Sequence, residues 1–303
     1  MDIDGKALAN ELHEEFRSFV ERLNGRKPGL AVVLVGDNPA SRLYVNGKVK
    51  ACEKVGIVSF KHELESSISE NELLQLIQQL NNNPTIDGIL VQLPLPKHIN
   101  NQLVTNAILP QKDVDGFHPV NLGKLMMGDP TGFVPCTPLG IQVMLKKNHV
   151  ETNGKHAVVV GRSIIVGKPM ASLLMQKSEG GNASVTVVHS RSKDIKLQCQ
   201  NADILIAAVG VPKIIKAGMV KENSVVIDVG QNKIDASDID RGYRIVGDVD
   251  YENVKEKCQL ITPVPGGVGP MTIAMLLNNT IKSFCYLNNN LSKNVCLQDF
   301  SCY

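Results

Sequence analysis

The feature that most restricts the fold is an alternation of short, Val-rich apolar runs with longer segments of helical period. The first run, residues 29–36, reads GLAVVLVG, and a second, residues 87–96, reads DGILVQLPLP. Continuous apolar runs of this kind are typical of strands buried in a parallel sheet. Ser69 and Glu72 have the spacing of a capping box at the start of a helix. The segments with helical period are residues 41–55 and 69–83. Strand–helix–strand order predicts a parallel α/β layer.

A second series of apolar runs begins at residue 155 and has a helical segment, residues 167–176, after its first run. The runs are residues 155–161, 183–190, 202–210 and 224–230, with residues 243–250 as a candidate edge strand. This succession is typical of a doubly wound dinucleotide-binding domain. A last helix is predicted at residues 269–287 and is expected to pack back on the first domain.

The length of 303 residues predicts two domains, at about 150 residues each. We therefore predict an α/β fold with an N-terminal α/β domain at residues 1–139 and a Rossmann-like domain at residues 140–268. The hinge is expected near PCTPLG, residues 135–140. Residues 269–303 supply the last helix and a tail without clear periodicity, which is expected to be disordered.

Composition and charge narrow the class of protein. A net charge of +2 gives no broad basic field, so nucleic acid is not expected as a partner. The seven cysteines include no C-x-x-C pair and no zinc spacing, which favours reduced thiols and no metal site. No signal or transit pattern stands at the start, and no apolar stretch reaches the roughly 18 residues of a membrane span. We expect a cytoplasmic protein without membrane contact.

The loop after the run at residues 155–161 reads GRSIIVG, with Gly161 closing the strand and Gly167 opening the helix. Ser163 stands where a second glycine is common in such loops. A helix N-terminus offers backbone N–H groups and a positive dipole to a phosphate. The loop therefore predicts a phosphate site, although glycines at strand ends are also common in ordinary turns.

The residues after the next run favour NADP over NAD. An NAD site usually has Asp or Glu at the end of the second strand, where it binds the ribose 2′-hydroxyl. Here that strand is followed by His189, Ser190 and Arg191. Arg162 and Arg191 can pair with a 2′-phosphate. The alternative is a solvated basic loop.

Tyr44 and Lys48 are four residues apart in a predicted helix, so both side chains lie on one face. This pair alone leaves two interpretations open. Lys48 is either a solvated surface lysine or a base held beside an aromatic ring.

Six motifs in order carry a resemblance to a known family. They are YVNGK at residues 44–48, VQLPLP at 91–96, KDVDGFHP at 112–119, PCTPLG at 135–140, VVVGRSIIVGKPM at 158–170 and ITPVPGGVGPMT at 261–272. The chain closely resembles the bifunctional methylenetetrahydrofolate dehydrogenase/cyclohydrolase family over about residues 3–285. Short-chain dehydrogenases also have Y-x-x-x-K, but after their glycine loop, whereas here it comes before the loop.

The resemblance implies a folate-binding first domain, a second domain that binds NADP, and an active-site cleft between them. It implies oxidation of 5,10-methylenetetrahydrofolate to the 5,10-methenyl cation with hydride transfer to NADP. Hydrolysis of that cation to 10-formyltetrahydrofolate follows at the same site. The resemblance also implies a homodimer and no metal.

The resemblance assigns roles residue by residue. It makes Lys48 catalytic, with Gln92 in contact with it and Asp115 binding the pterin. The substrate-binding residues implied are Tyr44, Val91, Leu93, Asp115, Pro263, Gly266 and Gly267. The cofactor-binding residues implied are Gly161, Arg162, Ser163, Ser190 and Gln231. Gln231 departs from the family, which often has isoleucine there. An insert at residues 177–184 is somewhat similar to one in mitochondrial NAD-using relatives.

The chemistry agrees with these roles. Hydride transfer needs positioning but no protein base, whereas hydrolysis needs a group that accepts and donates a proton, for which Lys48 is the candidate. One carboxylate, Asp115, can accept the adjacent amino and ring N–H donors of a pterin. Asp113 is a neighbouring alternative, and His118, before a proline, is expected to be structural. The rival functions are a shikimate-type dehydrogenase and a non-catalytic dinucleotide sensor.

Overall fold

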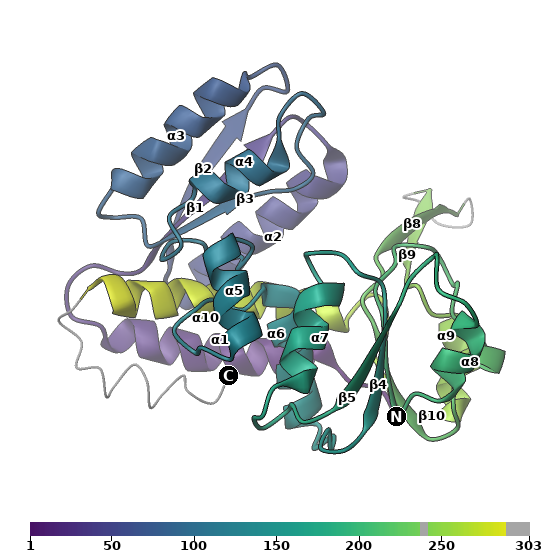
Figure 1. The fold of residues 1–303 in the computed structure, drawn as a ribbon. Helices are drawn as coiled ribbons and strands as arrows, with labels where there is room; N and C mark the ends of the chain where they lie inside the picture. Colours follow the sequence, from purple (N-terminus) through teal and green to yellow (C-terminus); the bar gives the residue numbers. More distant parts are fainter. Residues whose placement is uncertain (237–241, 289–303) are drawn as a thin grey trace. The chain divides into compact units, whose positions relative to one another are not determined.

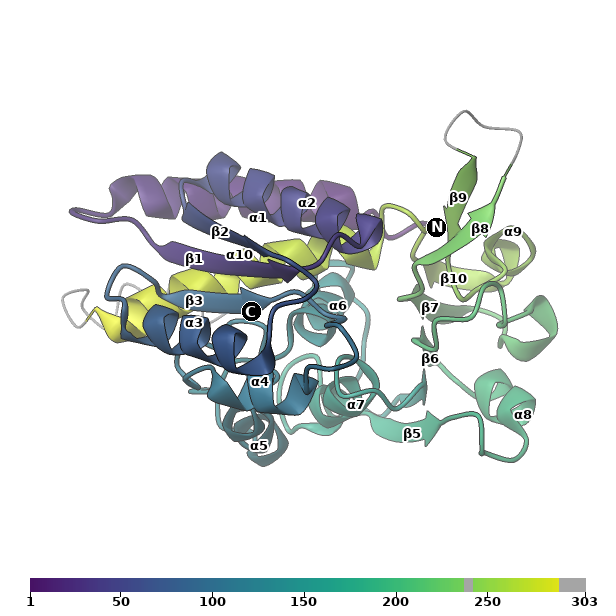
Figure 2. The ribbon, with the colours of Figure 1, turned by 90° about the horizontal axis from the view of Figure 1, so that it is seen from above.

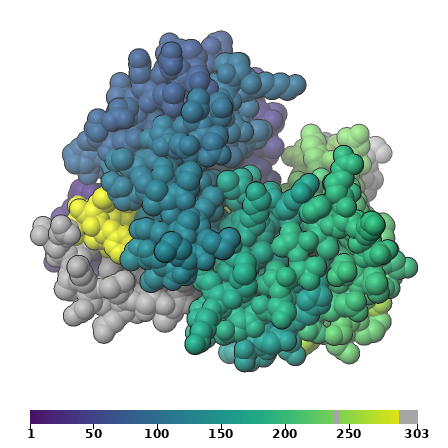
Figure 3. All heavy atoms as spheres, in the orientation of Figure 1, coloured from purple at the N-terminus to yellow at the C-terminus, as the bar shows by residue number. Residues whose placement is uncertain are grey.

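The structure is a computed structural model that describes residues 1–236 and 242–288, drawn in colour in Figures 1 and 3. The predicted disordered tail lies almost wholly outside the described residues. The chain divides by its contacts into two compact units. One is the five-stranded unit, Met1–Ala9 with Thr137–Thr272, and the other is the three-stranded unit, Asn10–Cys136 with the segment from Ile273 onward. The first nine residues thus belong with the second half of the chain, which the predicted bounds did not anticipate.

The three-stranded unit has a parallel sheet in the order β2-β1-β3. Its strands are β1 (Gly29–Val35), β2 (Val58–Leu64) and β3 (Gly88–Val91). Its helices are α1 (Gly5–Arg22, from Asn10), α2 (Pro39–Val55), α3 (Glu70–Asn82), α4 (Asn101–Ala107), α5 (Pro119–Met127) and α10 (Val268–Leu287, from Ile273). Figure 2 shows α1 and α2 on the opposite side of this sheet from α3 and α4.

The core of this unit follows from its sequence pattern. Alternate side chains of β1, Ala31, Val33 and Val35, are buried against Leu73 and Ile77 of α3. The remaining residues of β1 are buried as well, because both faces of the strand are covered. The apolar run at residues 29–36 therefore predicted a central strand for the right reason.

Local capping explains where the two predicted helices begin. α2 starts at Pro39, two residues before the predicted start, because Asn38 Oδ1 accepts the N–H groups of Ala40 (3.0 Å) and Ser41 (3.1 Å). The predicted capping box of α3 is confirmed, since Ser69 and Glu72 each accept the other's backbone N–H.

Two strand predictions in this unit need correction. β3 ends at Val91, well short of residue 96, because Pro94 has no N–H for a sheet ladder. β2 was not predicted at all. It is one of the two edge strands, reads VSFKHEL and is only partly buried, so it has no continuous apolar run to reveal it.

The five-stranded unit has a parallel sheet in the order β10-β7-β6-β4-β5. Its strands are β4 (His156–Val160), β5 (Ser184–Val188), β6 (Ile204–Ala207), β7 (Ser224–Asp228) and β10 (Cys258–Ile261). Its helices are α6 (Cys136–Lys147), α7 (Gly167–Met175), α8 (Ile195–Gln200) and α9 (Tyr251–Val254), with short 3₁₀ turns η1 (Ala217–Met219) and η2 (Lys255–Lys257). In Figure 1, α7 lies on the other side of the sheet from α8 and α9.

The predicted strands at the centre of this sheet are confirmed, but the predicted edge strand is wrong. Residues 243–246 form β9 (Tyr243–Val246), which pairs antiparallel with β8 (Asn232–Asp235) in a separate two-stranded sheet. The edges of this sheet are β5 and β10. β10 was missed because its four residues run directly into a Pro-Gly loop and offer too short a pattern to recognise. Residues 136–140 of the predicted hinge are the first turn of α6.

No helix in the described part of the chain is both long enough and apolar enough to cross a bilayer. Among the described cysteines, Cys52, Cys136, Cys199 and Cys258 are free thiols.

Candidate active site

Lys48 projects from α2 toward the end of β3. Its Nζ donates to Gln92 Oε1 at 3.0 Å. The Gln92 backbone N–H donates to Val33 O at 2.8 Å, which anchors the residue beside β1. The Gln92 side-chain amide donates to Leu93 O at 2.7 Å, and this bond turns its oxygen toward Lys48. A neutral amide therefore orients the lysine, as the motifs implied.

Tyr44 lies one turn before Lys48 on the same helix and is largely exposed. Partial burial of the ring raises the pKa of its phenol. The phenol is therefore a neutral hydrogen-bonding group at neutral pH. Its exposed ring offers an apolar surface next to the lysine.

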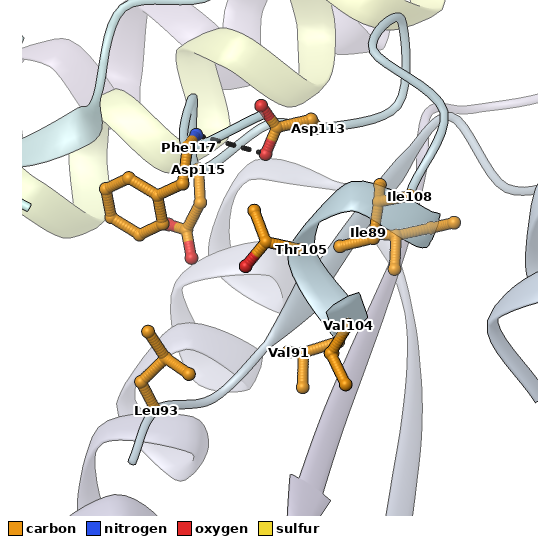
Figure 4. A pocket seen from close by; sticks show the side chains of 9 residues that line it. All are labelled: Ile89, Val91, Leu93, Val104, Thr105, Ile108, Asp113, Asp115 and Phe117. Carbon is orange, nitrogen blue, oxygen red and sulfur yellow. Dashed lines mark hydrogen bonds between the residues drawn. The ribbon is translucent and has the colours of Figure 1, made fainter. Parts of the chain in front are cut away.

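Asp115 lines a pocket beyond the carboxyl end of β3, drawn in Figure 4. The pocket is lined by Ile89, Val91, Leu93, Val104, Thr105, Ile108, Asp113, Asp115 and Phe117. Burial raises the pKa of Asp115, while the nearby positive charge of Lys48 opposes that rise. Asp115, Val91 and Leu93, three predicted site residues, thus share one pocket, and the charge of Lys48 acts on it.

Sequence reasoning missed five residues of this pocket: Ile89, Val104, Thr105, Ile108 and Phe117. Thr105 comes from α4, and Figure 4 shows its hydroxyl pointing toward the Asp115 carboxylate. Phe117 follows the KDVDG motif and forms part of the wall. Thr105 had no signal, because a single threonine in a short polar helix has no distinctive pattern. Phe117 could have been suspected from its place two residues after Asp115.

Asp113, the alternative carboxylate, is occupied by its own loop. Its oxygens accept N–H groups from Phe117 (3.3 Å), His118 (2.8 Å) and the Asn121 side chain (2.8 Å). Both carboxylates line the pocket, but these bonds tie Asp113 to its own loop and make it a structural residue. His118 is structural too, because its Nδ1 accepts the Val120 N–H and caps α5.

The GRS loop of the five-stranded unit requires glycine at both ends. Gly161 has a φ of +126°, and a Cβ there would lie 2.2 Å from Ala208 O. A Cβ on Gly167 would lie 2.3 Å from Gly161 O. The Ser163 Oγ accepts the N–H groups of Val166 (3.1 Å) and Gly167 (3.4 Å). The serine therefore ties the loop to the first residue of α7, whose N-cap is Val166.

The end of β5 lies directly beside this loop. The Gly161 N–H donates to Val188 O at 2.8 Å, which joins the ends of β4 and β5. Ser190 follows Val188 and is exposed, and Arg162 on the adjoining loop is exposed as well. Ser190 thus lies just past the end of β5, where an NAD site would have a carboxylate, and Arg162 lies on the adjoining loop.

The Pro-Gly loop forms a second pocket, wholly within the five-stranded unit. It is lined by Asp228, Val229, Gly230, Gln231, Pro263, Val264, Pro265, Gly266, Gly267, Val268 and Gly269. The predicted residues Gln231, Pro263, Gly266 and Gly267 therefore lie together. The Gln231 side chain packs so closely on Gly269 that a Cβ there would lie 2.5 Å from the Gln231 amide nitrogen.

Two buried aspartates organise the floor of this pocket. Asp228 accepts the N–H groups of Gly230 (2.9 Å), Asp248 (2.8 Å) and Val249 (2.9 Å). Asp248 in turn accepts two N–H groups of the loop after β6 and the side-chain amide of Asn232. The pair therefore holds three loops together at the carboxyl edge of the sheet, where ligands of such sheets bind.

The Asp228 carboxyl makes folding stability fall as the pH rises. Burial, with a smaller contribution from the Asp248 charge, raises its pKa from 3.8 to about 6. Between these values the folded protein holds a proton that the unfolded chain has released. The free energy of unfolding should therefore drop by roughly 3 kcal/mol across that window. Asp228→Asn cannot titrate, so urea unfolding at pH 4 to 7 should lack this drop. If the free energy of unfolding depends on pH in the same way in the variant and the wild type, Asp228 is not the group responsible for the drop.

Within residues 1–236 and 242–288, no group of three or more His, Cys, Asp or Glu side chains is arranged to hold a metal ion.

Comparison with known proteins identifies a family for the whole chain. The family model described as the tetrahydrofolate dehydrogenase/cyclohydrolase catalytic domain matches residues 3–115, and the NAD(P)-binding domain of the same family matches residues 135–288. The bifunctional protein FolD of Protochlamydia amoebophila is 56% identical over 289 residues, covering 95% of this chain and 99% of that protein.

Two solved structures are similar throughout. The bifunctional FolD enzyme of Campylobacter jejuni is 49% identical with a TM-score of 0.88, covering 96% of this chain and 99% of that one. The Trypanosoma brucei dehydrogenase-cyclohydrolase, solved with NADP cofactor and inhibitor, is 37% identical with a TM-score of 0.89, covering 94% of this chain and 97% of that one.

Proposed function

Since this chain belongs to the tetrahydrofolate dehydrogenase/cyclohydrolase family, we propose that Lys48, Gln92 and Asp115 carry its chemistry. The protein is an enzyme with both activities of the family and uses NADP. It oxidises 5,10-methylenetetrahydrofolate to the 5,10-methenyl form, which it then hydrolyses to 10-formyltetrahydrofolate. The observation that supports the proposal best is the Lys48–Gln92 hydrogen bond of 3.0 Å in the unit that also holds Asp115.

In the hydrolysis step, Lys48 moves the proton. Water adds to the methenyl carbon, and both of its protons must then leave the oxygen. One of them ends on a ring nitrogen as the C–N bond breaks, and the other is released to solvent. One amine within reach of both atoms can do both in turn. Gln92 holds the amine in place through a neutral oxygen.

In the dehydrogenase step, the protein positions the reactants. NADP, when bound, accepts the hydride, so the chain's task is to hold the reacting carbon close and correctly aligned. The Asp115 carboxylate accepts hydrogen bonds from two adjacent donors of the pterin, its amino group and a ring N–H. Val91 and Leu93 supply the apolar wall of the pocket. Tyr44 packs against the folate ring, and Pro263, Gly266 and Gly267 contact the substrate as well.

The cofactor is held at the GRS loop. Gly161 allows the backbone to approach the phosphates, and the start of α7, to which Ser163 is bonded, faces them. Arg162 and Ser190 bind the 2′-phosphate, and Gln231 contacts the nicotinamide end. The loop at residues 177–184 resembles a loop of NAD-using relatives, but it contains neither Arg162 nor Ser190, so both groups remain for the 2′-phosphate.

A single assay tests both activities. Purified protein is mixed with methylenetetrahydrofolate and NADP, and absorbance is followed for NADPH and for the methenyl product. Both signals should rise, and the methenyl signal should then fall as hydrolysis proceeds. A shikimate-type dehydrogenase would instead oxidise a polyol, and a non-catalytic sensor would give no signal.

The protein is further proposed to be a cytoplasmic homodimer. β5 is an edge strand with a free ladder of backbone groups, and Val187 in it is 38% exposed. An exposed strand of this kind is a template for pairing with a second copy. The only partner expected besides a second copy is the small-molecule folate.

Replacing Val187 with lysine should break the dimer. A charge in the middle of an edge strand opposes strand pairing, because the ammonium would have to be buried against the partner strand. Light scattering coupled to gel filtration should report a dimer for wild type and a monomer for Val187→Lys. A monomeric wild type would contradict the homodimer. If wild type and Val187→Lys are both dimers, the interface does not include β5.

A further inference from the structure

The backbone on both sides of Asp115 is fixed by groups that no step of the reaction uses. On one side, the Val114 carbonyl accepts a hydrogen bond from Asn279 Nδ2 at 2.9 Å. The thiol of Cys136 donates to the same carbonyl at 3.3 Å. On the other side, Gly116 has a φ of +78°, and a Cβ there would lie 2.6 Å from the Pro135 nitrogen. Asp115 thus lies in a turn whose two ends are both held.

Asn279 joins the two segments that hold this turn. It lies on α10 with 1% of its surface exposed, and its Nδ2 also donates to Val134 O at 3.0 Å. One amide nitrogen therefore uses both of its protons. The first goes to the residue before Asp115, and the second goes to the segment on which Gly116 packs.

A second side chain of α10 repeats this arrangement one turn later. Ser283 Oγ lies 2.6 Å from both Asp87 O and Gln111 O. Gln111 directly precedes the KDVDG motif. α10 is therefore attached through polar side chains to the backbone just before the motif and inside it.

The chemistry at position 279 admits few substitutes. Two carbonyl oxygens converge on one nitrogen, so the site needs a short side chain with two donors on a single atom, which among neutral residues of this length is asparagine. An apolar side chain would leave both carbonyls without that donor in a buried place. Buried polar groups left unpaired are costly, so the segments would move toward other partners.

We propose that Asn279 is a positioning residue for the folate site and fixes where the Asp115 carboxylate stands. The proposal rests on the proposed role of Asp115 in binding the pterin. Displacement of a substrate-binding group by about 1 Å is enough to cost roughly tenfold or more in turnover or binding. Asn279 acts through Asp115 and does not itself touch the substrate.

The test compares Michaelis constants in Asn279→Leu, which keeps the shape of the side chain and removes both donors. The constant for methylenetetrahydrofolate should rise roughly ten- to a hundredfold, whereas the constant for NADP should stay at its wild-type value. A Michaelis constant does not depend on how much of the sample is folded. If Asn279→Leu gives too little folded enzyme, Asn279→Ser, a smaller change, is measured in the same way.

Thr280→Val is the matched control. Thr280 is buried on the same helix, and within the described residues its hydroxyl bonds only Leu276 O of that helix, at 2.8 Å. The control should lose thermal stability but keep the wild-type folate constant. An unchanged folate constant in both Asn279 variants overturns the proposal when Asp115→Asn, measured in parallel, raises that constant. If Asp115→Asn leaves the constant unchanged, the proposed role of Asp115 fails and this inference falls with it.

Discussion

Lys48→Met should lower hydrolysis of the methenyl cation by roughly 10²- to 10⁴-fold, the usual contribution of a general acid–base group. Methionine keeps most of the apolar stem and removes the amine, together with its bond to Gln92. Hydride transfer involves no proton, so the dehydrogenase rate should fall much less. Folding should be nearly unaffected, because Lys48 is only partly buried and its side chain is not part of the core. Both rates and the thermal melt are measured on one sample.

Lys50→Met is the control for this experiment. Lys50 lies on the same helix and is exposed, so its loss removes an equal charge without touching the site. It should keep both activities. If the Lys48→Met enzyme hydrolyses the methenyl cation at the wild-type rate, Lys48 is a solvated helix lysine and the proton must be moved by another group.

Arg162→Ala should weaken the binding of NADP by about ten- to a hundredfold and leave the binding of NAD nearly unchanged. A charge-assisted hydrogen bond to a phosphate contributes roughly 1.5–3 kcal/mol. NAD has no 2′-phosphate, so it loses nothing when this bond is removed. Steady-state kinetics with both cofactors provides the measurement, with the ratio of the two efficiencies as the readout.

Lys193→Ala serves as the control for the general positive field of this region. Lys193 is exposed three residues after Ser190. Removing its charge should lower the affinity for NADP only slightly. Equal losses for NAD and NADP in the Arg162 variant would mean that the guanidinium binds a part common to both cofactors.

The parts of the fold that could be predicted are those whose signal is local. β1, β4, β6 and β7 are covered on both faces, so each appears in the sequence as an unbroken apolar run. β2 and β10 lie at sheet edges and have no such run. A half-exposed strand and a four-residue strand look like loops until their neighbours are known.

The same distinction applies to the candidate site. Lys48, Gln92 and Asp115 stand in recognisable motifs, whereas Thr105 enters the pocket from a helix with no motif at all. Asn279 reaches Val114 across 165 positions of sequence. Contacts of that range depend on how distant elements pack, and a local pattern has no means of specifying them.

The way the chain closes on itself bears on its synthesis. Ile3 donates to Ile261 O at 2.8 Å, and Ile261 donates to Met1 O at 3.0 Å, so the first residues complete the edge of a sheet whose last strand is β10. In the other unit, the Val114 carbonyl accepts its hydrogen bond from Asn279, which is synthesised 165 residues later. Neither unit can be completed on the ribosome until nearly the whole chain has emerged. A nascent chain stalled before residue 258 should therefore remain sensitive to protease in both halves.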